Sequence, residues 1–142
     1  MLKTQFMNGP TIHTTRTDDL IDFLQMHGME VEALESSIYR VVRDGELPVF
    51  LNIGDEVLSF EVDLGSIAEI GSEDLYKALL DANTEIQPVS FGLDNTNPDD
   101  PRLVLAESRV VGDLSDREIL SVFDALELAT DKAVTILAPL VK

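Results

Sequence analysis

The sequence predicts an α+β fold, with a twisted, mostly antiparallel five-stranded sheet and helices packed on it. Alternating apolar and polar residues connected by short turns indicate antiparallel strands, most clearly over residues 57–65. Apolar residues three and four positions apart indicate amphipathic helices, most clearly over residues 114–140. The expected order is α-β-β-β-α-β-β-α, which has too few helices for a doubly wound fold.

Three segments have helical spacing. The first, Thr17–Gly28, has a threonine N-cap, two aspartates in its first turn and a glycine at its end. The second covers residues 72–83 and starts with a serine cap. The third, residues 114–140, opens with a capping box formed by Ser115 and Glu118.

Five segments are expected to be strands. Three of them, residues 37–43, 47–53 and 57–65, are joined by an Asp-Gly turn and a Gly-Asp turn, which predicts a meander. The other two, residues 88–93 and 102–110, follow the second helix. The chain from residue 17 to 142 is therefore expected to form one α+β domain.

The composition limits the possible chemistry and location. The chain has 142 residues and no cysteine, so disulfides, thiolate catalysis and cysteine-ligated metals are excluded. No apolar run reaches the roughly 20 residues that a membrane helix needs. The first 16 residues lack the continuous apolar core of a signal peptide. We therefore expect a cytoplasmic protein that does not insert directly into a membrane.

The charge of the chain is strongly acidic and unevenly distributed. The formal net charge is −17, and such a field repels phosphate backbones and anionic lipid surfaces. Nucleic acid is therefore not an expected partner. Residues 1–16 contain Lys3 and Arg16 but no acidic residue, so they form a basic N-terminal arm. This arm is interpreted as a frayed terminus, with contact to the acidic body or to a partner as the alternative.

Residues 94–100 crowd several aspartates and asparagines between two predicted strands. An EF-hand calcium loop needs oxygen ligands at positions 1, 3 and 5 and glycine at position 6. Counted from Asp94, position 5 is Pro98 and position 6 is Asp99, so the pattern fails. Asparagine, aspartate and proline favour tight turns, so we interpret the segment as a hairpin loop. Weak calcium binding by its carboxylates stays open, and no dedicated metal site is expected.

No catalytic constellation or cofactor motif is apparent. His13 and His27 are far apart in the sequence and have no zinc-ligand spacing. Glu61 and Asp63 could in principle serve a hydrolase, but neighbouring acids on a solvated strand face are the simpler interpretation. Phosphate-binding glycine loops and a GxSxG elbow are missing as well. We therefore expect no catalytic residues and no cofactor.

The outer face of the predicted sheet is the remaining candidate site. The strand patterns place Tyr39, Phe50, Val104 and Ala106 on this face, as an apolar patch. Exposed apolar patches often mark protein interfaces, so these four residues are candidates for partner binding. The alternative is that a helix covers them. A slip of one residue in register would also exchange the two faces.

Three stretches resemble the uncharacterised bacterial YjfI family. They are "LPVFLNIGDEVLSFEVDL", "LYKALLDANTEIQPVSFGLD" and "LSDREILSVFDALELATDKAVTILAPLVK", within residues 45–142. The segment "PVSFG" at 88–92 is similar in type to a strand of that family, with shorter internal spacing. The resemblance implies no catalytic residues. It implies a protein partner similar to phage-shock protein A, which acts in envelope stress.

The element order, with "LLDAN", "SFGLD", "PRLVLAESRV" and "LSDREI", is also similar to the CesT/SycE-type chaperones of type III secretion. This resemblance implies a small acidic cytoplasmic homodimer that binds extended segments of client proteins. The resulting hypothesis is a non-enzymatic, chaperone- or adaptor-like protein-binding module. The alternatives are a small carboxylate- or metal-dependent enzyme and a structural subunit of a stable complex.

Overall fold

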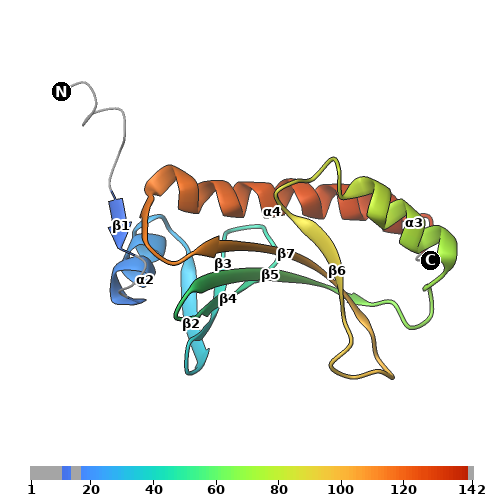
Figure 1. Ribbon diagram of the computed structural model, residues 1–142, viewed down its shortest axis with the longest axis horizontal. Coiled ribbons are helices and arrows are strands. Elements are labelled where there is room, and N and C mark those ends of the chain that lie inside the picture. Colours follow the sequence, from blue (N-terminus) through green and yellow to red (C-terminus); the bar gives the residue numbers. More distant parts are fainter. Residues whose placement is uncertain (1–10, 14–16, 141–142) are drawn as a thin grey trace. The chain divides into compact units, whose positions relative to one another are not determined.

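The computed structural model describes residues 11–13 and 17–140 (Figure 1). In chain order, the elements are β1 (Thr11–His13), α2 (Thr17–Met26), β2 (Glu30–Glu35), β3 (Ile38–Val42), β4 (Val49–Ile53), β5 (Val57–Ser66), α3 (Glu73–Ala82), β6 (Ser90–Asp94), β7 (Arg102–Val110), β8 (Asp113–Ser115) and α4 (Asp116–Leu137). No helix of the described ranges is long and apolar enough to cross a membrane.

The α+β class is confirmed, but the strand count is corrected. The main sheet has six strands in the order β2-β3-β4-β5-β7-β6, and β1 pairs with β8 in a separate two-stranded sheet. The prediction of five strands omitted β2, as well as the two short strands β1 and β8. In β2, every residue except Val31 is exposed, so neither face of the strand has to be apolar. Its sequence, EVEALE, therefore lacks the strong alternation that marks a half-buried strand. Its pairing with β3 determines its structure instead.

Two compact units divide the described chain. The first contains the described part of Met1–Phe60 together with Ser108–Phe123, and the second contains Glu61–Glu107 with the described residues from Asp124 onward. β5, β7 and α4 contribute to both units because the boundaries fall within them. The expectation of one α+β domain over residues 17–142 stays a prediction.

The core of the first unit lies on one face of its strands. Leu58 and Phe60 of β5 are buried, as expected from the alternation in that strand. The ring of Phe60 meets that of Phe123, from the first half of α4, edge to face with centroids 5.8 Å apart. The guanidinium of Arg43 lies 6.0 Å from the centre of the Phe123 ring. These contacts fix the first half of α4 through aromatic packing.

In the second unit, α3 packs through Leu75, Leu79 and Ala82, which are all buried. These residues follow helical spacing, so the apolar stripe predicted for residues 72–83 is confirmed. The second half of α4 buries Leu126, Ala129 and Ala133. Lys132 of this half forms an ion pair with Glu85, at 2.7 Å, just after α3.

The glycine end of α2 and the serine cap of α4 agree with the prediction, but α4 is shorter than the predicted range 114–140, because residues 113–115 form β8 and the helix ends at Leu137. Gly28 has φ of +80°, a left-handed conformation that suits glycine after a helix, and α2 ends two residues before it. The capping box of α4 is complete. The backbone N–H of Glu118 donates to Oγ of Ser115 at 3.1 Å, and the N–H of Ser115 donates to Oε1 of Glu118 at 3.2 Å.

Replacing the cap of α4 is expected to destabilise the protein. In Ser115→Ala the N–H of Glu118 loses its acceptor, and the unfolding free energy should fall by about 1 kcal/mol. Ser121→Ala is the matched control in the same helix, because exposed Ser121 donates to the Glu118 carbonyl and alanine favours the helix interior. Urea denaturation measures both changes. Equal effects of the two substitutions would contradict the capping role.

Candidate functional site: an apolar groove between α3 and the β6–β7 hairpin

The predicted patch residues of the first unit do not share a face. Tyr39 lies opposite Leu51 in the β3–β4 register, whereas Phe50 lies opposite Arg40. Residues directly opposite each other point to the same side of a sheet, and Leu51 is fully buried. Tyr39 is therefore on the core side, and its placement beside Phe50 on the outer face was wrong. Because β3 has apolar residues on both faces, its sequence does not show which face is buried.

The predicted patch residues of the second unit share a face, but Val104 is not exposed. Val104 and Ala106 lie opposite Gly92 and Ser90 in the β6–β7 register. Val104 is only 7% exposed and Ala106 is half-buried, so the expectation of an exposed patch is corrected here. A role of Tyr39, Phe50, Val104 or Ala106 in partner binding stays a prediction.

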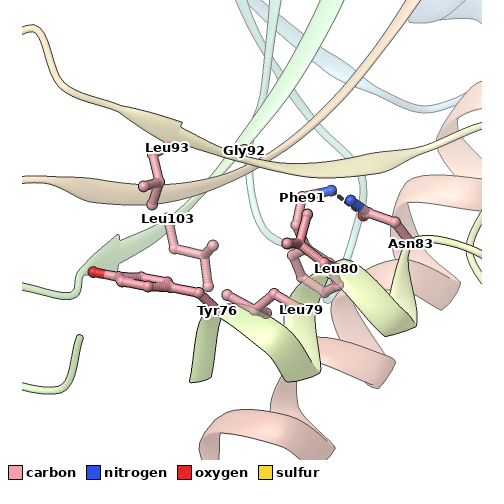
Figure 2. A pocket seen from close by; sticks show the side chains of 8 residues that line it. All are labelled: Tyr76, Leu79, Leu80, Asn83, Phe91, Gly92, Leu93 and Leu103. Carbon is pink, nitrogen blue, oxygen red and sulfur yellow. Dashed lines mark hydrogen bonds between the residues drawn. The ribbon is translucent and has the colours of Figure 1, made fainter. Parts of the chain in front are cut away.

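The other face of this hairpin, beside α3, is apolar as well. Leu93 lies opposite Leu103, and Phe91 lies opposite Leu105, so these four residues share one face. Together with α3, part of this face encloses a groove of about 240 Å³ (Figure 2). The lining residues are Tyr76, Leu79, Leu80, Asn83, Phe91, Gly92, Leu93 and Leu103.

Three of the side chains that line the groove are accessible from solvent. Leu80 is 68% exposed, Leu93 47% and Tyr76 39%. Figure 2 shows Tyr76 along one end of the groove and Leu80 on the side of α3 near Phe91. In the sequence, Tyr76 and Leu80 lie beside the apolar stripe of α3 that contains the buried Leu79. The stripe is therefore wider than one buried face requires, and this width indicates that some of its apolar side chains are exposed.

One hydrogen bond fixes the end of α3 to β6. The backbone N–H of Phe91 donates to Oδ1 of Asn83 at 2.6 Å (Figure 2). Asn83 is the C-cap of α3, and its backbone N–H donates to the Leu79 carbonyl. The Asn83 side chain thus provides a hydrogen-bond acceptor for a backbone N–H of β6 that would otherwise be unpaired at the groove wall.

Tyr76 is held at the opposite end by a close approach of the backbone. A Cβ atom on Gly71 would lie 2.5 Å from the hydroxyl oxygen of Tyr76 and 3.2 Å from the Ile67 carbonyl oxygen. Glycine at position 71 therefore provides the space in which the phenol lies. Tyr76 and Asn83 carry the polar side-chain atoms of the lining, and the other lining side chains are apolar. The site is suited to contact with apolar groups.

The β6–β7 loop is a hairpin turn, as expected for residues 94–100. Oδ1 of Asp94 accepts from the Thr96 hydroxyl at 2.6 Å and from the Thr96 N–H at 3.0 Å. Oδ1 of Asn97 accepts from the N–H of Asp99 at 3.1 Å. These are local turn bonds of the Asx type. Within the described residues, no three histidines, cysteines or acids are grouped so that they could hold a metal ion.

Charged groups cluster on the strands beside this loop. Nε of Arg102 donates to Oδ2 of Asp63 at 2.8 Å, and its guanidinium also reaches Asp100 at 3.2 Å. A hydrogen bond from Ser66, helped by Arg102, lowers the pKa of Asp100. Burial, followed by repulsion from Asp94 and Asp63, raises the pKa of Glu61. These acids do not line the groove, so the pairing of Glu61 with Asp63 has no place in that site.

The opposite pKa shifts predict opposite effects of two neutralising substitutions. A raised pKa means that ionised Glu61 opposes folding at pH 7 and ceases to do so as pH falls toward its ordinary value of 4.5. Glu61→Gln should therefore stabilise the protein at pH 7 and have less effect at pH 4.5. The lowered pKa of Asp100 gives stability that is lost only below its ordinary value of 3.8.

Asp100→Asn, the control, should consequently destabilise the protein at both pH 7 and pH 4.5. Urea denaturation midpoints at the two pH values measure both variants against the unsubstituted chain. A stabilisation by Glu61→Gln that is the same at pH 4.5 as at pH 7 would contradict the assignment.

Comparisons with solved structures support the fold. A chain of the heterodimeric ExoU–SpcU complex from the type III secretion system of Pseudomonas aeruginosa matches with a TM-score of 0.64 and 20% identity. The match covers 83% of this chain and 97% of that one. YbjN from E. coli matches with a TM-score of 0.58 and 15% identity, over 89% and 91% of the two chains. Both chains are similar to this one in fold.

Among curated protein sequences no match is found. The comparison with protein families, in contrast, matches residues 14–142 to CesT_Tir_1, a type III secretion chaperone family. This match covers nearly the whole chain, including the three helices and every strand of the main sheet. The chain therefore belongs to the CesT_Tir_1 family.

Proposed function

We propose that the protein is a non-enzymatic, chaperone-like module that binds an apolar segment of a partner protein in the groove between α3 and the β6–β7 hairpin. The observation that carries the proposal is the concentration of partly exposed Tyr76, Leu80 and Leu93 around one hollow. Exposed apolar side chains that gather around a hollow usually serve an interaction. Membership of a secretion chaperone family supports the same role.

The chemistry of the groove favours binding over catalysis. Its polar side chains are the amide of Asn83, which already accepts from the Phe91 N–H, and the phenol of Tyr76. Neither forms a nucleophile–base pair with another lining residue. A hollow of about 240 Å³ accommodates one or two apolar side chains, which suits an anchor of a protein segment.

The net charge of the protein indicates which residues flank the apolar anchor in the partner segment. The net charge of −17 favours a partner segment in which basic residues flank the apolar anchor, since electrostatic complementarity speeds association and excludes wrong partners. Action in the cytoplasm and assembly as a homodimer belong to this proposal, as does a partner similar to phage-shock protein A. A molar mass of 15.6 kDa in solution would indicate a monomer, and twice that value would indicate the homodimer.

Acidic substitutions in the groove are expected to weaken partner binding without unfolding the protein. Leu80→Asp and Leu93→Asp remove apolar contacts and bring a carboxylate into the interface, so affinity for the partner should fall at least about tenfold. Leu128→Asp on α4 is the matched control, because Leu128 is 71% exposed and does not line this groove.

The partner is first recovered from the host with the unsubstituted protein and identified by mass spectrometry, and its binding to each variant is then measured by calorimetry. Circular dichroism checks that the variants remain folded. Binding that is lost equally in Leu128→Asp, or retained in both groove variants, would refute the assignment of the groove.

A further inference from the structure

Gly71 lies directly before α3, in a turn that brings it beside the Tyr76 side chain. The backbone N–H groups of Ile70 and Gly71 both donate to the Ile67 carbonyl, at 3.3 and 2.9 Å. Ser72 follows as the N-cap of α3. The position of Gly71 is therefore fixed by backbone hydrogen bonds on one side and by the start of the helix on the other.

The backbone conformation at position 71 does not explain the glycine. Its φ angle lies outside the left-handed region that favours this residue. A Cβ atom here would lie 3.2 Å from the Ile67 carbonyl oxygen, which a shift of a few tenths of an ångström relieves, but only 2.5 Å from the hydroxyl oxygen of Tyr76. The missing Cβ atom therefore serves the position of the Tyr76 phenol.

This arrangement turns the ring of Tyr76, and not its hydroxyl group, toward the groove. Tyr76 lines the hollow, whereas Gly71, against which the hydroxyl lies, does not. Figure 2 shows the ring along one end of the hollow, with the hydroxyl on the side away from Asn83. Phe91, the other aromatic lining residue, is buried, so a partner meets the ring of Tyr76 first.

The accessible ring favours an aromatic side chain in the partner. Two aromatic rings in edge-to-face or offset contact attract each other beyond the burial of their area, and a leucine side chain does not gain this contribution. The rest of the lining offers mainly leucine side chains, which provide apolar contact without such a preference. The preference of the groove for one kind of apolar anchor thus depends on where the Tyr76 ring lies.

The charge of α3 indicates what accompanies the aromatic anchor. The helix contains Glu73, Asp74 and Asp81, and its one basic residue, Lys77, forms an ion pair with Glu73 at 3.3 Å. Basic residues beside the anchor would therefore meet a complementary charge. A second copy of the chain would instead bring the same acidic helix toward this one.

We propose that Gly71 is a positioning residue that acts through Tyr76 and makes the groove selective for an aromatic anchor, phenylalanine, flanked by basic residues in the partner segment. The proposal rests on the protein-binding function above and names the chemistry of the partner. Because the glycine lets the phenol lie outside the hollow, the ring is already placed before the partner arrives, and binding does not have to order it.

The test uses two labelled nine-residue peptides that have lysines around a central phenylalanine or a central leucine. Fluorescence anisotropy should show that the unsubstituted protein binds the phenylalanine peptide about fivefold more tightly than the leucine peptide. Gly71→Ala should remove most of this preference, because the new Cβ atom displaces the phenol. Tyr76→Leu should remove it as well, without any change at position 71.

A double substitution separates this role from a structural one. In the Tyr76→Phe background the ring carries no oxygen at 2.5 Å, and its nearest carbon, Cζ, lies 3.4 Å from the new Cβ atom, an ordinary contact. Gly71→Ala should therefore leave the peptide preference of that background unchanged. Backbone strain at position 71 would instead lower the preference in both backgrounds.

The position of the ring is also measured without a peptide. Tyr39 and Tyr76 are the two tyrosines of the chain, so fluorotyrosine labelling gives two ¹⁹F NMR signals, and Tyr39→Phe assigns the one from Tyr76. Gly71→Ala should shift the Tyr76 signal. An unchanged signal would show that the Cβ atom does not move the phenol, and would overturn the proposal.

The proposal is also overturned if the unsubstituted protein does not bind the phenylalanine peptide more tightly, or if Gly71→Ala acts equally in both backgrounds. If Gly71→Ala and the double variant both fail to fold, the glycine serves the backbone, and the proposal fails. A dimer that Leu80→Asp converts to a monomer would assign the groove to a second copy. If Leu80→Asp weakens binding of the host partner while the two peptides bind alike, the groove proposal stands and this one falls.

Discussion

The hydrogen bond from the Phe91 N–H to Oδ1 of Asn83 determines the geometry of the groove. It joins the end of α3 to the edge strand β6 across 2.6 Å, and so sets the distance between the two walls of the site. The register of β6 with β7 then places Phe91, Leu93 and Leu103 on the face beside α3. Tyr76 closes one end because Gly71 leaves room for its phenol. The apolar site therefore depends on a polar contact at its end.

Acidic charge and apolar exposure have separate places in the second unit. Asp63, Asp100 and Arg102 form ion pairs beside the β6–β7 loop, where the carboxylates are solvated and locally hydrogen-bonded. The groove is lined almost entirely by apolar side chains. This separation keeps charged groups away from the surface that would be desolvated on binding, where an unpaired charge is costly. It also leaves the acidic field available to attract a basic partner over longer distances.

Local rules were sufficient for the elements whose sequence and burial agree. The stripe of α3, the capping box of α4 and the alternation of β5 all follow from side-chain spacing, and each is present in the structure. The sequence was not sufficient where a strand is apolar on both faces or exposed on both. The face on which Tyr39 lies follows only from the β3–β4 register, and the strand β2 is defined only by its pairing with β3. Both depend on pairing between segments, which periodicity does not encode.

A photo-crosslinking amino acid at position 93 tests the central claim most directly, with position 128 as the control. The account predicts that the partner is crosslinked in the host from position 93, through a peptide that contains apolar residues beside basic ones, and not from position 128. Leu93 lines the groove and Leu128 does not, although both are exposed. A partner that co-purifies with the protein but is crosslinked from position 128 and not from position 93 would contradict the account.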